Sequence, residues 1–174
     1  MRWLRLLIAL IRARFRPSLD VNGFSESDFT VWITDVDASV MNHAALMTVM
    51  EAGRIDFMVR SGFFRLARKN KWYVPSAAIS VQFIRPLKLF QKARVNTGVL
   101  HVSDEWIYLR QHVSRQGRDI ATCIVKSTIK KQRERVNIHE VLKQLGNPEW
   151  TVGNTAVIEQ FEMHLLQQGR TDDR

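Results

Sequence analysis

Residues 42–61 form a segment that is apolar on nearly all sides when it is drawn as a helix, and this feature most restricts the fold. Its apolar members are Ala44, Ala45, Leu46, Met47, Val49, Met50, Ala52, Ile55, Phe57, Met58 and Val59. A helix with one apolar stripe lies on a surface, whereas a helix that is apolar all round has to be covered on most sides. The segment therefore predicts a buried central helix and a fold that wraps around it.

The segments after this helix are typical of long strands, because they are rich in β-branched and aromatic residues. These four segments span residues 72–83, 93–102, 105–113 and 119–130. The connections at 103–104 and 114–118 have hairpin lengths, so an antiparallel order is expected. A further strand is predicted before the helix at 28–36, where Phe29, Val31 and Ile33 alternate with Thr30, Trp32 and Thr34.

These elements together predict an α+β protein in which a curved antiparallel sheet of about five strands wraps around one long buried helix. This arrangement is the hot-dog architecture. A basic amphipathic helix is expected at 1–17, a linker at 18–27, the hot-dog domain at 28–136 and a C-terminal helical extension with a polar tail at 137–174. The basic residues 65–71 are expected to form a loop after the central helix.

The formal net charge of +9 is concentrated in three short segments. Residues 2–16 and 60–71 each carry +5, residues 126–135 carry +4, and the rest of the chain sums to −5. A nucleic-acid-binding domain presents a broader basic surface and a recognisable motif, and this chain has neither. The charge therefore argues against a nucleic-acid partner and calls for a separate explanation of each segment.

Residues 2–16 can be drawn as a helix with one basic face and one apolar face. The basic face holds Arg2, Arg5, Arg12 and Arg16, and the apolar face holds Trp3, Leu6, Leu7, Leu10 and Ile11. The pattern suits a helix on an anionic membrane surface, and it equally suits a helix docked on its own domain or on a partner subunit. The apolar run 6–11 is shorter than a membrane span, and arginines follow it in place of a cleavage site. A cytoplasmic protein is therefore expected, and peripheral membrane contact through residues 2–16 and docking of this helix on protein are both left open.

Three motifs in order resemble the 4-hydroxybenzoyl-CoA thioesterase-like hot-dog family, over residues 28–131. They are WITDVDASVMNHAALMTVMEAGRIDFMVRSGF at 32–63, ISVQFIRPLKLFQK at 79–92 and WIYL at 106–109. The segment Gly53 to Asp56, followed by Arg60 and Gly62, is similar to the thioesterase superfamily member six group in particular. The resemblance implies an acyl-CoA thioesterase and a homodimer or higher homo-oligomer whose sheet continues into a second subunit.

Asp37 is the leading candidate for the catalytic carboxylate. Thioester hydrolysis needs an activated water or a carboxylate nucleophile, together with donors for the developing oxyanion. The amino end of the buried helix supplies such donors, and Asp37 precedes it. By resemblance, Asp37 matches the second acid of a D-x-D motif that is catalytic in some family members. The alternative is that Asp35 or Asp37 only caps the loop and the helix.

Three further residues are candidates at the same site. Asn42 and His43 lie at the predicted helix start, where either side chain would hold the substrate carbonyl or a water, and His43 would also assist proton transfer. Alternatively Asn42 is an N-cap and His43 has a structural role. Glu51 is a candidate because some hot-dog thioesterases place a carboxylate on the central helix. Its spacing to Arg54 also suits an ion pair.

The two internal basic clusters are candidates for binding the phosphates of coenzyme A. They comprise Arg65, Arg68, Lys69 and Lys71 after the helix, and Lys126, Lys130 and Lys131 on the last strand. The alternative is that they are solubilising surface charges. The five histidines lack metal-ligand spacing and Cys123 is the single cysteine, so no metal and no cofactor beyond the substrate's CoA are expected.

The sequence thus favours an acyl-CoA thioesterase of lipid metabolism, acting on an apolar acyl chain because the central helix is rich in Met and Phe. A non-catalytic hot-dog module that binds acyl groups or partner proteins is the alternative. A basic nucleic-acid or membrane adaptor is the third and weakest hypothesis, because the charge is local.

Overall fold

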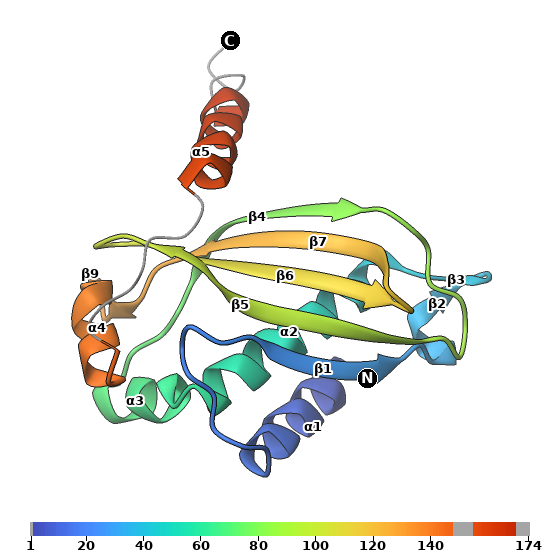
Figure 1. The fold of residues 1–174 in the computed structure, drawn as a ribbon, viewed down its shortest axis with the longest axis horizontal. Helices are drawn as coiled ribbons and strands as arrows, with labels where there is room; N and C mark the ends of the chain where they lie inside the picture. The colour runs from blue at the N-terminus through green and yellow to red at the C-terminus, as the bar shows by residue number, and fades with distance from the viewer. Residues whose placement is uncertain (1, 148–154, 170–174) are drawn as a thin grey trace.

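The fold is a five-stranded antiparallel sheet that wraps around the long helix α2 (His43–Arg60) (Figure 1). The computed structural model describes residues 2–147 and 155–169. In the order in which they lie side by side, the strands are β1 (Ser25–Thr30), β5 (Lys92–Val102), β6 (Ile107–Arg115), β7 (Arg118–Ser127) and β4 (Ser76–Phe83). The predicted α+β hot-dog architecture is therefore confirmed.

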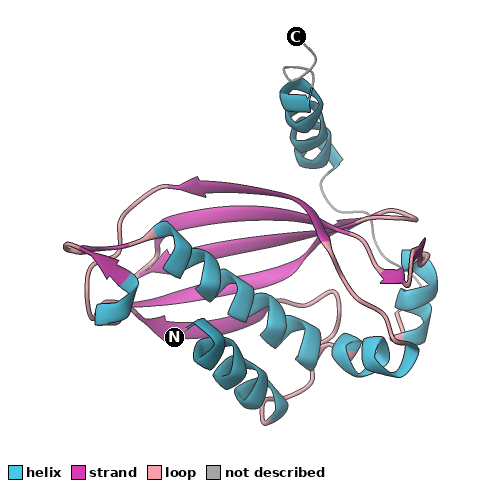
Figure 2. Cartoon of the chain, turned by 180° about the vertical axis from the view of Figure 1, so that it is seen from behind, coloured by secondary structure: helices cyan, strands magenta, loops and turns pink. Residues whose placement is uncertain are grey.

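α2 lies along one face of the sheet, where its side chains form the main core (Figure 2). Met50 of α2 is completely buried, as are Val113 of β6 and Val125 of β7. Gly53 lets the helix approach β5 closely, because a Cβ atom there would lie 2.9 Å from Thr97 Oγ1. The buried central helix that the apolar pattern predicts is thus present, and its closest contact with the sheet is made at a glycine.

The first strand begins earlier and ends earlier than the sequence predicts. β1 covers Ser25–Thr30. The prediction of a strand at 28–36 is therefore wrong after residue 30, and the prediction of a linker at 18–27 is wrong from residue 25 onward. The chain leaves the sheet after Thr30 and forms a 3-10 turn, η1 (Ile33–Asp35), because the Asp35 carboxylate accepts the backbone N–H of Trp32 at 2.9 Å. This local hydrogen bond competes with strand pairing, and Ile33 is consequently exposed. The rest of the predicted domain division stays a prediction.

The basic segment after α2 is a helix, α3 (Phe63–Asn70), and the prediction of a loop at 65–71 is therefore wrong. Left-handed residues border it, with φ of +80° at Gly62 and +57° at Lys71. Arg, Leu, Ala and Lys between them favour the helical state, and Phe63 and Ala67 are buried against the rest of the domain.

The N-terminal helix α1 (Arg2–Arg14) packs along α2, on the same side of the sheet (Figure 2). The structure therefore shows the docked arrangement, one of the two that its pattern allows. Leu6 and Ala13 are buried in this contact. The contact with a membrane surface that residues 2–16 also predict stays a prediction. Met1 and the side chain of Arg2 lie outside the described residues.

Two arginines of the basic face turn toward buried carboxylates of the domain. Arg5 binds Asp35 at 2.6 Å, and Arg16, just after the helix, binds Asp56 at 3.0 Å. Ile11 of the apolar face is consequently about half exposed. A buried carboxylate needs a paired charge, and this requirement decides which face of α1 docks.

The C-terminal extension has two helices, as expected. α4 (Ile138–Gln144) is capped by Asn137, whose side chain accepts the backbone N–H groups of His139 and Glu140. α5 (Thr155–Gly169) packs on the face of the sheet opposite α2, where Phe161 contacts Tyr108 edge-to-face. The polar tail from residue 170 lies outside the described residues. No helix in the described ranges is both long and apolar enough to cross a membrane.

Candidate active site

A hollow of about 710 Å³ opens at the amino end of α2. Three parts of the chain enclose it: the small hairpin of β2 (Val36–Asp37) and β3 (Val40–Met41), the first turn of α2, and the end of β4 with the turn after it. The lining residues are Asp37, Val40, Met41, Asn42, His43, Ala44, Leu46, Phe83, Ile84, Arg85, Pro86 and Leu87. Three of the four predicted catalytic residues, Asp37, Asn42 and His43, therefore meet in one hollow.

Backbone hydrogen bonds on both sides hold the hairpin that carries Asp37. The Met41 N–H donates to the Leu87 carbonyl at 2.7 Å, and the Asn42 N–H donates to the Asp35 carbonyl at 2.8 Å. Ala38, next to Asp37, has a φ of +57°, so the chain turns tightly there. The Asp37 side chain is exposed toward solvent rather than buried in the core. A water or a substrate can therefore reach its carboxylate.

Asn42 has two contacts at this helix end. Its Oδ1 accepts the backbone N–H of Ala45 at 2.7 Å, which confirms the N-cap interpretation. Its Nδ2 donates to Asp37 Oδ1 at 3.4 Å, a long hydrogen bond. The first N–H groups of a helix have no partner within it, so those of His43 and Ala44 remain available. Asn42 thus orders the helix start and bonds the carboxylate beside it.

His43 is the first residue of α2, and its imidazole lies against the ring of Phe83 with 4.2 Å between the ring centroids. The contact joins the helix to the end of β4 across the hollow. The imidazole itself is exposed. It is therefore placed where it can contact a ligand as well as the protein.

Glu51 does not line the hollow. It lies eight residues after His43 on α2, which is about 12 Å along the helix. Its negative charge partly opposes the desolvation that lowers the pKa of the Arg54 guanidinium. Arg54 donates a hydrogen bond to Gln111 Oε1 at 2.7 Å. Glu51 thus lies close enough to Arg54 for its charge to act on the guanidinium, and it lies outside the hollow, whereas the Glu51–Arg54 ion pair itself stays a prediction.

Neither basic cluster predicted for CoA reaches this hollow within one chain. Arg65, Arg68, Lys69 and Lys71 lie beyond the carboxyl end of α2, which is 18 residues and so about 27 Å long. Lys130 and Lys131 form β8 (Lys130–Lys131), which pairs with β9 (Glu134–Arg135). Lys126 is half-buried under α5, where its Nζ binds Glu162 at 2.8 Å and lies 4.3 Å from the Trp106 ring centroid. A part for these residues in CoA binding stays a prediction.

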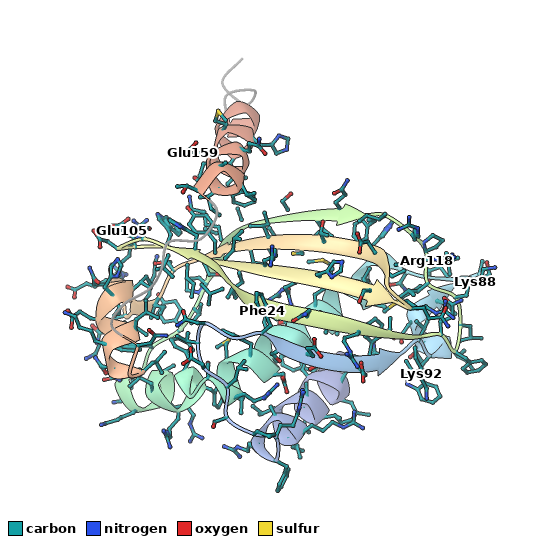
Figure 3. The ribbon with its side chains drawn as sticks, viewed as in Figure 1. Phe24, Lys88, Lys92, Glu105, Arg118 and Glu159 are labelled. Atoms are coloured by element: carbon teal, nitrogen blue, oxygen red, sulfur yellow. The ribbon has the colours of Figure 1, made fainter. Side chains whose placement is uncertain are left out.

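Two other cations lie beside the hollow, and the sequence analysis did not propose either for substrate binding. Arg85 lines the hollow and donates to the Asp119 carbonyl at 2.7 Å. Lys88 forms an isolated bridge with Val40 of the hairpin. Figure 3 shows Lys88 near Arg118 at this end of the sheet. Both cations belong to the R-P-L-K turn at 85–88, which is one of the motifs that resemble the family.

The described residues contain no group of three or more His, Cys, Asp or Glu side chains that could hold a metal ion. Cys123, the single cysteine, is buried in the sheet. The polar side chains that line the hollow are the Asp37 carboxylate, the Asn42 amide, the His43 imidazole and the Arg85 guanidinium.

A comparison with known families places the chain. The sequence profile of the thioesterase-like superfamily matches residues 31–146, which is more than half of the chain. The chain belongs to the thioesterase-like superfamily. The match covers the whole hollow, including Asp37 and Arg85. This membership confirms the family that the sequence motifs resemble. It also confirms the predicted class of enzyme, a thioester hydrolase. Comparison with curated proteins gives no significant match.

Solved structures share the fold of this superfamily member at low sequence identity. A probable thioesterase from Bartonella henselae is 18% identical with a TM-score of 0.61, covering 66% of this chain and 98% of its own. The probable thioesterase YbaW from Escherichia coli is 14% identical with a TM-score of 0.65, covering 71% and 97%. A hypothetical protein from Staphylococcus aureus in complex with CoA is 13% identical with a TM-score of 0.65, covering 77% and 92%.

Proposed function

We propose that this protein is an acyl-CoA thioesterase, which hydrolyses an acyl thioester to the free acid and CoA in the hollow at the amino end of α2. One observation carries the proposal. A solvent-accessible carboxylate, Asp37, is hydrogen-bonded to Asn42, the N-cap of a helix whose first two N–H groups, those of His43 and Ala44, have no partner within it. A base and an oxyanion-binding group thus face one hollow.

The proposed reaction follows from these two groups. The substrate carbonyl oxygen binds at the backbone N–H groups of His43 and Ala44, where the helix dipole favours a developing negative charge. Asp37 accepts a proton from a water whose oxygen adds to the carbonyl carbon. The tetrahedral intermediate collapses, the C–S bond breaks, and the thiolate of CoA leaves with a proton. Direct attack by Asp37, followed by hydrolysis of the anhydride, uses the same geometry.

The roles of Asn42 and His43 support this step. The Asn42 amide holds the Asp37 carboxylate toward the helix end. His43 is exposed at the same point, where its imidazole can pass the proton that Asp37 accepted on to the leaving thiolate. Glu51 takes no direct part in the proposed reaction, since it lies near Arg54 and outside the hollow.

The lining of the hollow supports an apolar acyl group, because eight of its twelve residues are apolar: Val40, Met41, Ala44, Leu46, Phe83, Ile84, Pro86 and Leu87. CoA as the leaving group is supported by the hypothetical protein from Staphylococcus aureus, which shares the fold and whose structure contains CoA. Arg85 lines the hollow and Lys88 forms a bridge with Val40 of its lining, and we propose these two cations for the CoA phosphates. The clusters at 65–71 and 126–131 would serve CoA only across a subunit interface.

We further propose a homodimer that forms through β4. This strand is an edge of the sheet, since it pairs only with β7 among the described strands. It is long, and Ile79 and Phe83 are each more than 40% exposed. A long apolar edge strand is normally paired or protected. Since Phe83 also lines the hollow, a second subunit at β4 would lie directly beside the candidate site.

A panel of acyl-CoA substrates of different chain length, assayed for free thiol, tests the activity. We expect turnover of at least one substrate, and a fall in kcat of about 10²-fold or more for Asp37→Asn. Glu105→Gln is the matched control, because Glu105 is an exposed carboxylate at the opposite end of the sheet (Figure 3). Saturable acyl-CoA binding without any turnover would overturn the hydrolase proposal and leave a non-catalytic acyl-binding module.

Light scattering of wild type and Ile79→Asp tests the dimer. We expect a dimer for the wild type and a monomer for the variant, because a charge on the β4 edge opposes pairing. An unchanged mass for Ile79→Asp would place the interface elsewhere.

A further inference from the structure

α1 presents an apolar face away from the domain, although its other side packs on α2. The exposed apolar side chains are Trp3, Leu4, Leu7, Ile8, Ile11 and Phe15. At 100° per residue the five of them within α1 fall on one side of the helix, and Phe15 directly follows its last residue. We call these six residues the α1 outer face. Trp3 and Phe15, which mark its two ends, are 81% and 86% exposed.

A basic hollow of about 630 Å³ lies beside this face, between α1 and α3. Its lining includes six cations and no carboxylate: Arg14, Arg16, Arg60, Arg65, Arg68 and Lys69. We call it the α1–α3 hollow. Arg16 and Arg60 bind the buried Asp56. The other four cations have no ion-pair partner in the part of the chain that the structure describes.

The apolar face and the basic hollow are parts of one continuous surface. Arg14 lines the hollow, and it lies on α1 between Ile11 and Phe15 of the outer face. Arg12 is exposed on the other flank of the same apolar stripe. An apolar stripe with cations on both flanks is the arrangement that lets a helix lie in the interface of a bilayer.

We propose that the α1 outer face and the α1–α3 hollow dock this protein on an anionic lipid bilayer. The apolar side chains would enter the boundary between headgroups and acyl chains, and the hollow would receive lipid phosphates. The aromatic rings at both ends of the face suit the headgroup level, where Trp is enriched.

The charges favour a bilayer over a second copy of the chain. α1 and α3 together carry Arg12, Arg14, Arg65, Arg68 and Lys69 on or beside this surface, and neither helix contains an acidic residue. Two copies facing each other here would bring these cations together, which costs free energy. An anionic bilayer supplies the opposite charge and an apolar layer at the same time.

Docking does not rest on the proposed hydrolysis, since its surface lies outside the candidate site. Docking would also bear on the proposed site, because the Arg5–Asp35 hydrogen bond connects α1 to the turn before that site. An acyl-CoA with a long apolar chain partitions into membranes, so docking would bring the enzyme to its substrate.

Sedimentation of the full chain with vesicles tests the proposal. We expect binding to vesicles of phosphatidylcholine mixed with phosphatidylglycerol, weaker binding at raised salt, and none to phosphatidylcholine alone. Ile11→Glu and Arg68→Glu should each weaken binding by about tenfold or more. Both positions are at the surface, so the variants should fold, which circular dichroism checks. Arg118→Glu has the same charge change as Arg68→Glu, on the strand β7, and should bind as the wild type does.

Equal sedimentation with both vesicle types, or wild-type binding by Ile11→Glu, would overturn the proposal and leave the face for a protein partner. Release of the bound protein by free CoA would show that the α1–α3 hollow binds CoA phosphates in place of lipid. Hydrolysis of acyl-CoA in solution, measured in parallel, separates a failure of docking from a failure of the proposed activity.

Discussion

Arg5 of α1 donates a hydrogen bond to Asp35 across 2.6 Å, and this pair connects the N-terminal helix to the candidate site. The Asp35 carboxylate, which is nearly buried, also accepts the N–H of Trp32. Its backbone carbonyl accepts the N–H of Asn42, the cap of α2. A single acidic residue therefore fixes α1, the turn before the site and the helix start relative to one another.

Replacing Arg5 should loosen this connection. In Arg5→Met, the Asp35 carboxylate keeps the Trp32 N–H as its one partner among the described residues, and an inadequately paired, buried carboxylate costs about 1–3 kcal/mol of unfolding free energy. Urea unfolding measures this loss, and hydrogen exchange should be faster for the backbone of residues 35–42. Arg12→Met is the control, because Arg12 is exposed on the same helix. Equal stability of the two variants would contradict the role of the pair.

Gly53→Ala tests the close contact between α2 and β5. The added Cβ would lie 2.9 Å from Thr97 Oγ1 and 3.1 Å from Val95 Cγ1, so the helix and the strand have to move apart. Such overpacking costs about 1–3 kcal/mol, although alanine favours a helix by about 1 kcal/mol over glycine. We expect a net loss of stability in thermal or urea unfolding. A more stable variant would show that the sheet yields to the methyl group.

Local patterns predict the central part of this protein well. The apolar residues 42–61 indicate a buried helix, and Asp37 and Asn42 are close to its start in sequence, so they are necessarily close in space. The end of β1 was missed because one long-range and one local hydrogen bond of Asp35 outweigh the strand pattern at 31–33.

The surface of α1 and the distant basic clusters could not be placed from the sequence. Which face of an amphipathic helix docks depends on partners such as Asp35 and Asp56, which are 30 and 40 residues away from Arg5 and Arg16. Similarly, a cation count gives no distance from the cluster at 65–71 to Asp37. That distance is set by the length of α2.

The buried polar network around Gln111 should contribute strongly to stability. Gln111 is fully buried, donates to the Met50 carbonyl and to Thr97 Oγ1, and accepts from Arg54. Gln111→Leu leaves the half-buried Arg54 guanidinium without this acceptor, and we expect a loss of about 1–3 kcal/mol of unfolding free energy. Removing both groups in Arg54→Met/Gln111→Leu should recover part of that loss. Additive losses in a double-mutant cycle would show that the two side chains are independent.

The buried Cys123 thiol makes the stability of the protein fall as the pH rises in the alkaline range. Burial raises the pKa of its thiol to about 11 from an ordinary value of 9.0, and the Arg54 charge only partly opposes this effect. Between these two pH values the unfolded chain releases the thiol proton while the folded protein keeps it. The contribution of the neutral, buried thiol to the stability of the fold is therefore fully present below about pH 9 and is lost as the pH rises through about 11. Wild type should lose more stability than Cys123→Ala over this interval in urea unfolding.

The same burial predicts the reactivity of the Cys123 thiol. Only the thiolate reacts with an alkylating reagent, and the folded protein holds the thiol neutral and buried. At pH 8 we expect slow labelling by iodoacetamide in buffer and rapid labelling in urea, with mass spectrometry as the readout. Labelling in buffer as fast as in urea would mean that β7 opens readily, and it would also contradict the pH dependence expected of the folded state.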